Sequence, residues 1–103
     1  MVRQTLNSSL LDGLFRALAD PTRRFMFEAL CEEDASVSWL AEPLPMALSV
    51  VMAHIHALEK GGLIRTYKSG RVRTCCVEPQ ALRLLYRWIS EQHGRWERRQ
   101  TRA

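Results

Sequence analysis

The strongest constraint on the fold is a change of hydrophobic period at Gly61-Gly62. Before this pair, apolar residues recur at the spacing of one buried face of a helix that runs from Ala47 to Lys60. These residues are Val51, Ile55 and Leu58. After the pair, two short runs rich in β-branched residues flank a turn at residues 68–70, which predicts a β-hairpin. Because glycine adopts the left-handed conformation without a Cβ penalty, the pair predicts a helix end directly before the hairpin.

A shorter helix precedes these two elements. Ser36 is a suitable N-cap for it, and Pro43 and Pro45 end it and set a turn. The order helix, turn, helix, hairpin over residues 36–77 is that of a winged helix-turn-helix, in which the hairpin is the wing. Further helices are expected at residues 8–19, 21–31 and 79–98. We therefore expect one mainly α-helical domain over residues 1–103 with a small β-hairpin, and flexible ends at residues 1–7 and 99–103.

A second face of the helix from Ala47 to Lys60 is free of the buried stripe. Its members fall at helical spacing and are Ser49, Met52, Ala53, His56 and Lys60. The tip of the wing is cationic, with Lys68, Arg71 and Arg73. A helix with a free face followed by a basic hairpin suits double-stranded DNA, with the helix in the major groove and the hairpin on phosphates or in the minor groove.

The charge is distributed unevenly along the chain. The net charge is +4, but residues 1–59 carry four basic and eight acidic side chains, whereas residues 60–103 carry eleven basic and three acidic ones. A basic half favours a polyanionic partner through counterion release, although a solvated surface with a basic tail fits the charge equally well. No run is apolar enough for a membrane span or a signal peptide, so we expect a cytoplasmic protein.

The first and last helices carry apolar stripes that predict an interface. In the last helix the stripe is too apolar for a lone terminal helix, so we expect it to pack on the first helix and on a second copy of the chain. The expected interface residues are Leu10, Leu14, Leu18, Leu82, Leu85, Trp88, Ile89 and Trp96.

The cysteines and histidines give weaker signals. Cys75 and Cys76 are neighbours on a strand and point to opposite faces, so they do not converge on one ion. Cys31 fits a small buried hydrophobe better than a sensor. His54 and His56 lie about 200° apart around one helix axis and cannot chelate one ion together. The sequence has no paired-carboxylate cleft, nucleophile elbow, phosphate loop or zinc-hydrolase motif, so no enzymatic activity is expected.

Several blocks of the sequence resemble, in the correct order, the ArsR/SmtB (arsenic-repressor) family of bacterial transcription regulators. The blocks are Leu14–Arg24, Val37–Ala41, His54–Arg65 and Gly70–Arg73, and the resemblance covers about residues 10–98. It implies a homodimer joined through the first and last helices, which binds an operator of imperfect twofold symmetry and represses nearby genes. It also implies a DNA contact for His54 and leaves phosphate contacts to Arg65 together with the wing cations.

The sequence departs from the family pattern at the reading helix and at the metal sites. Ala47, Met52 and Ala53 stand where the family usually has polar or basic residues, and Met52 and Ala53 would instead meet thymine methyl groups. The segment Val37–Ala41 lacks the family's cysteine pair, and in the last helix only His93 with Glu91 or Glu97 is available as a ligand. We therefore expect no metal site and no cofactor.

Two alternatives stay open. The same fold can serve as a sensor that responds to a thiol reagent, through Cys31 with Cys75 or Cys76, or to a small-molecule inducer bound near Trp88 and Trp96. It can also serve as a protein-interaction module.

Overall fold

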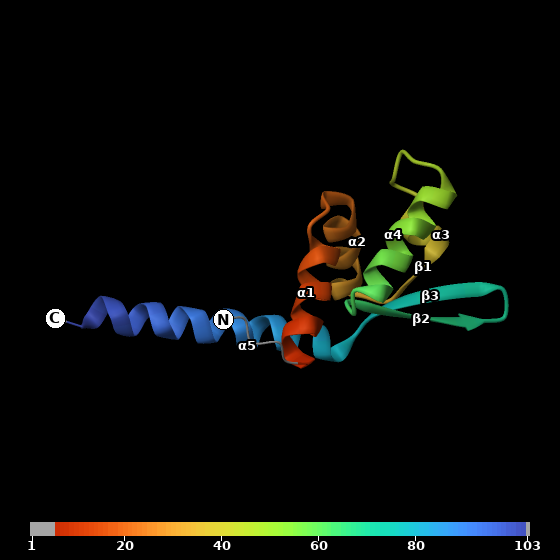
Figure 1. Ribbon diagram of the computed structural model, residues 1–103. Coiled ribbons are helices and arrows are strands. Elements are labelled where there is room, and N and C mark those ends of the chain that lie inside the picture. Colours follow the sequence, from red (N-terminus) through yellow and green to blue (C-terminus); the bar gives the residue numbers. More distant parts are fainter. Residues whose placement is uncertain (1–5, 103) are drawn as a thin grey trace.

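The computed structural model describes residues 6–102 and has the winged helix-turn-helix architecture (Figure 1). Its elements are α1 (Leu6–Leu18), α2 (Pro21–Glu32), β1 (Ala35–Ser36), α3 (Val37–Ala41), α4 (Leu48–Lys60), β2 (Ile64–Ser69), β3 (Val72–Val77) and α5 (Pro79–Thr101). The flexible arm predicted for residues 1–7 lies mostly outside the described residues, but α1 already begins at Leu6. At the other end α5 continues to Thr101, three residues beyond the helix end that the sequence predicts, and the flexibility of residues 99–103 stays a prediction.

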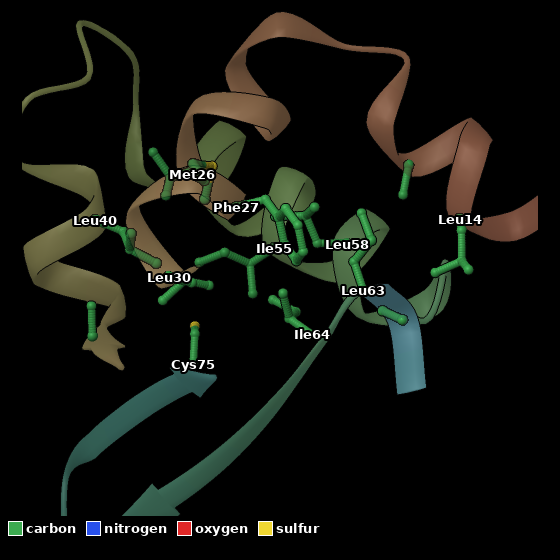
Figure 2. Packing of buried hydrophobic residues seen from close by; sticks show 14 residues of the cluster. Leu14, Met26, Phe27, Leu30, Leu40, Ile55, Leu58, Leu63, Ile64 and Cys75 are labelled. Carbon is green, nitrogen blue, oxygen red and sulfur yellow. The ribbon is translucent and has the colours of Figure 1, made fainter. Parts of the chain in front are cut away.

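The core lies beneath α4, as the hydrophobic period predicts. Val51, Ile55 and Leu58 are all fully buried. They pack among residues from α2, α3, the start of β2 and β3, including Met26, Leu30, Leu40, Ile64 and Cys75. Figure 2 shows Ile55 and Leu58 within this cluster, with Cys75 reaching it from the sheet. The opposite face of α4 is therefore left outside the core.

Two helices begin at side chains of a type that is typical of N-caps. The Asp20 side chain accepts a hydrogen bond of 3.0 Å from the backbone N–H of Arg23, with Pro21 at the first position of α2. The Ser36 hydroxyl accepts one of 3.1 Å from the backbone N–H of Trp39 in α3. Both side chains accept hydrogen bonds from backbone N–H groups that have no partner inside the helix, and this fixes the residue at which each helix begins.

The end of α4 is a Schellman motif, and its two glycines have different roles. The N–H of Gly62 donates to the carbonyl of Glu59, and that of Leu63 donates to the carbonyl of Leu58. Gly62 has the left-handed φ of 88°, whereas Gly61 keeps an ordinary helical conformation. Gly61 is instead required by packing: a Cβ there would lie 2.6 Å from the Cβ of Ala17 and 2.7 Å from the carbonyl oxygen of Gly13.

The sheet has three antiparallel strands in the order β1-β3-β2, one more than the sequence predicts. The unpredicted strand β1 is only two residues long, and it pairs Ala35 with Cys75 and Ser36 with Thr74. The hairpin itself is longer than expected, because Ser69 pairs with Val72 and leaves a two-residue loop. Gly70 opens this loop at φ 62°, the position where a type II′ turn requires glycine.

The long helix α5 extends away from the rest of the molecule (Figure 1). Its first turns pack against α1, where the rings of Phe15 and Trp88 meet edge to face at 5.5 Å. The principal extents of 60 × 25 × 22 Å reflect this projection. None of the helices in the described part of the chain is long and apolar enough to cross a membrane.

Candidate nucleic-acid interface

The free face of α4 is a row of exposed side chains on the side away from the core. Ser49, Ala53, His56 and Lys60 are exposed, and Met52 is half-buried at the edge of the row. Ala47, the N-cap of α4, provides no side-chain acceptor for the first amides of the helix. The structure therefore brings five of the predicted contact residues onto one accessible face.

His54 lies outside this row and turns toward α2. Its Nδ1 atom is 3.9 Å from a carboxylate oxygen of Asp20, and only 18% of its side chain is exposed. The backbone N–H of Arg23 holds the pKa of Asp20 below its ordinary value, and His54 acts in the same direction. His54 thus links α4 to the start of α2, and the geometry does not bring it to the face where a base contact is predicted.

The wing and α4 enclose a hollow of about 430 Å³ that gathers the predicted cations. It is lined by Ser36, Val37, Ser38, Met52, Lys68, Arg71, Val72 and Arg73. Met52 of the free face of α4 thus shares a hollow with all three cations of the wing. The sequence reading missed the hydroxyl groups of Ser36 and Ser38, although the N-cap at Ser36 places this segment at the start of α3. Hydroxyl and cationic donors around one hollow suit phosphate oxygens.

A side-chain network holds the wing against α4. The backbone N–H of Thr66 donates to the Glu59 carboxylate at 3.3 Å, and the Thr66 hydroxyl lies 3.1 Å from the same carboxylate. The Arg73 guanidinium donates to the Thr66 hydroxyl at 3.0 Å. Neither Glu59 nor Thr66 is singled out by the sequence, because their contact depends on how the hairpin folds back on the helix.

Arg65 is separate from the other predicted phosphate contacts. Its Nε atom lies 3.3 Å from a carboxylate oxygen of Glu78, which precedes α5. It does not line the hollow between α4 and the wing. The structure therefore places Arg65 at the junction of the sheet with α5, while Lys68, Arg71 and Arg73 lie together.

The predicted interface residues divide into two groups. Leu14 is 2% exposed and belongs to the core, so in the single chain it leaves almost no surface for the dimer interface to which the sequence assigns it. Leu18 and Leu85 are half-buried against the same core. The other five residues stay exposed in the single chain, and Phe15, which the sequence reading did not name, is exposed beside Trp88. The exposed members are Leu10, Phe15, Leu82, Trp88, Ile89 and Trp96.

The surroundings of two of the three cysteines disfavour an activated thiol, and the third, Cys76, is half-buried. Cys31 is exposed, against the prediction that it is buried, because it lies on the outer side of the last turn of α2. Desolvation, together with Glu32 and Glu28, raises its pKa. Cys75 is fully buried, and burial raises its pKa to about 11. A raised pKa disfavours the reactive thiolate.

Within residues 6–102, no group of three or more candidate ligands could hold a metal ion.

Comparisons with known proteins agree with this architecture. The family model of a helix-turn-helix domain matches residues 18–67. A crystal structure of an ArsR family transcriptional regulator is 50% identical over 85% of this chain and 97% of that chain, with a TM-score of 0.82. An ArsR-like transcriptional regulator from Rhodococcus sp. RHA1 is 29% identical over 92% and 90% of the two chains, with a TM-score of 0.79.

A more distant structure shares the fold. The homodimeric winged helix-turn-helix DNA-binding domain of a possible ArsR-family regulator from Mycobacterium bovis is 22% identical over 90% of this chain and 93% of that chain, with a TM-score of 0.66. No curated protein matches the chain.

Proposed function

Because the chain belongs to the ArsR family of transcriptional regulators, we propose that it is a homodimeric repressor that reads an operator with α4. The observation that carries this proposal is the hollow where Met52 of the free helix face meets Lys68, Arg71 and Arg73 of the wing. One element supplies side chains for base edges and the other supplies cations for phosphates. Such a role places the protein in the cytoplasm.

In this proposal α4 enters the major groove and the wing lies on the flanking backbone. Ser49 and His56 are exposed hydrogen-bonding side chains on the free face, and Met52 and Ala53 offer apolar contacts to thymine methyl groups. Lys60 extends the row at the C-terminal end of the helix. Arg73 is held by Thr66, so its charge is positioned before DNA arrives.

The exposed apolar side chains of α1 and α5 support dimerisation. On the described parts of these two helices, seven large apolar or aromatic side chains are exposed, including Phe15 and Trp88, which already pack together. A patch of this kind on a small domain marks a protein interface. A twofold dimer would place the two α4 helices in successive major grooves, about 34 Å apart along the DNA.

The test is fluorescence-anisotropy binding to the DNA upstream of the protein's own gene and to a shuffled duplex, each over a range of salt concentrations. We expect binding to the shuffled duplex to be weaker by about 10³-fold. Equal binding to both duplexes, lost steeply with salt, would contradict an operator-specific repressor and leave only non-specific attraction by the basic wing.

Two substitutions separate the roles of the wing and the helix. Arg71→Ala is expected to weaken binding to every sequence and to reduce the salt slope by about 1, because it removes one phosphate contact. Met52→Ala is expected to change sequence preference more than salt response. Arg87→Ala on α5, outside the hollow, is the matched charge control. If Arg71→Ala and Met52→Ala changed affinity and slope equally, these assignments would be wrong.

A further inference from the structure

A second hollow, of about 410 Å³, lies where α1, α2 and the C-terminal end of α4 meet. It is lined by Ser9, Gly13, Arg16, Ala17, Arg23, Ala57, Lys60 and Gly61. Ala57 lies about 140° around the helix axis from Met52, so this hollow opens on a different side of α4 from the wing. Its size falls in the range of small-molecule sites, about 300–1,000 Å³.

The lining contains three cations and no acidic residue. Arg16 comes from α1, Arg23 from α2 and Lys60 from α4. Among residues 6–102, none of these three cations has a carboxylate within 4 Å, whereas Arg65 and His93 each have one. Three helices therefore each contribute a cationic residue to this hollow, and Asp20, whose pKa Arg23 helps to lower, is a counter-charge for Arg23 beyond ion-pair distance.

Arg23 is held in place before any ligand binds. Its Nε atom donates to the carbonyl oxygen of Ala17 at 2.7 Å, and Nη2 donates to the carbonyl oxygen of Arg16 at 3.2 Å. A guanidinium group has five N–H donors, so these two bonds leave three for a ligand. An arginine whose fork is fixed in this way loses little side-chain freedom when it binds an oxyanion.

The backbone crossing beside the hollow keeps its walls close together. Gly13 and Gly61 meet there, and a Cβ on Gly13 would lie 3.1 Å from the carbonyl oxygen of Gly61. Because neither glycine has a side chain, α1 and the end of α4 approach closely, and Arg16 and Lys60 line the same hollow. The Ser9 hydroxyl supplies one more donor in the lining.

We propose that this hollow binds a small free oxyanion with at least two negative charges, such as a phosphate compound or a dicarboxylate. Guanidinium and ammonium groups bind such anions through charge-assisted hydrogen bonds. The ligand would connect α1 and α2 to the end of the helix that reads DNA. If the proposed DNA-binding function holds, anion binding would also change operator affinity.

The experiment is a ¹H–¹⁵N NMR titration of the full chain with pyrophosphate, at constant ionic strength balanced with chloride and without DNA. The amide signals of Gly13 and Gly61 are expected to shift and saturate. That of Gly94 in α5 is the internal control and is expected to stay in place; Gly70 is not used as a control, because it lies beside the cations of the wing. Arg23 is left unchanged because its bonds to Ala17 and Arg16 support the end of α1.

The variant that tests the ligand contacts is Arg16→Gln combined with Lys60→Gln. It is expected to weaken pyrophosphate binding about tenfold or more, since hydrogen bonds to charged groups are lost. Arg87→Gln is the matched control and is expected to bind as the unchanged protein does. Unchanged dispersion of the remaining signals shows that each variant is folded.

Four results would overturn the proposal. One is a shift that never saturates, and another is an equal shift at Gly94, because both indicate general screening. The third is saturable binding that Arg87→Gln weakens as much as the double variant does. The fourth is that pyrophosphate does not bind; if the double variant then reduces the salt slope of DNA binding, the cations contact DNA phosphates and not a free ligand. Operator-specific binding could stand in each of these cases.

Discussion

Replacing Gly61 with alanine tests the tight crossing of α1 and α4. The new Cβ would lie 2.6 Å from the Cβ of Ala17 and 2.7 Å from the carbonyl oxygen of Gly13. One contact is with a Cβ atom and the other with a backbone oxygen, so rotation of a flexible side chain cannot relieve either contact. The two helices must therefore move apart near Gly61, where Leu14 of α1 packs in the core.

The size of the effect follows from two opposing terms. Overpacking a well-packed contact costs about 1–3 kcal/mol. Alanine also restricts the unfolded chain, which returns about 0.4–1 kcal/mol, because Gly61 at φ −75° has a conformation that alanine adopts without strain. We expect Gly61→Ala to lower the free energy of unfolding by about 1–2 kcal/mol. Each kcal/mol corresponds to a decrease in Tm of about 4–8 °C.

Gly94→Ala in α5 is the matched control. Its Cβ would meet only the end of the flexible Arg98 side chain, at 3.3 Å, within a regular helix. Alanine is favoured over glycine there by about 0.5–1 kcal/mol, so this variant is expected to be more stable than the unchanged protein. Both are measured by urea unfolding at equal protein concentration, because the proposed dimerisation would make stability depend on concentration. If Gly61→Ala proved as stable as the unchanged protein, the helices would not cross as closely as described.

Three further perturbations test the wing, a helix cap and the thiols. Thr66→Val removes the hydroxyl between Glu59 and Arg73, and each hydrogen bond lost costs about 0.5–1.5 kcal/mol. We expect operator binding to weaken a few-fold and amide hydrogen exchange in the hairpin to become faster; unchanged exchange would exclude a role of Thr66 in holding the wing. The lowered pKa of Asp20 stabilises the fold above its ordinary pKa of 3.8, and this stability is lost as pH falls below that value. In urea unfolding, the free energy of unfolding of Asp20→Asn is therefore expected to fall less on acidification than that of the unchanged protein; equal decreases would exclude this contribution. In iodoacetamide labelling followed by mass spectrometry, exposed Cys31 is expected to react before buried Cys75, whose pKa is raised to about 11; early labelling of Cys75 would contradict its burial.

The sequence predicts what depends on short-range patterns. The buried face of α4 follows from the spacing of its apolar residues, and the caps at Asp20 and Ser36 follow from residue type and from the residues after them. In these cases the physical cause lies within a few residues. The helix order and the hairpin, and with them the winged helix-turn-helix architecture, could therefore be predicted without coordinates.

What the sequence does not predict depends on contacts between distant segments. Glycine inside a helix usually weakens it, but Gly13 is where α1 meets Gly61. Leu14 fits an apolar stripe, and only the crossing of α1 with α4 shows that this residue is buried in the core of its own chain. His54 lies next to the reading face in sequence, yet it turns toward Asp20. In each case the partner is more than 30 residues away, where periodicity gives no information.

The short strand β1 has a mechanical consequence for regulation. Through Ala35 and Ser36 it joins the start of α3 to β3, while Thr66 joins the hairpin to α4 from the other side. These contacts connect α4, α3 and the wing into one block. We expect a signal that releases the protein from DNA to leave the shape of this block unchanged and to alter the angle between the two blocks of a dimer.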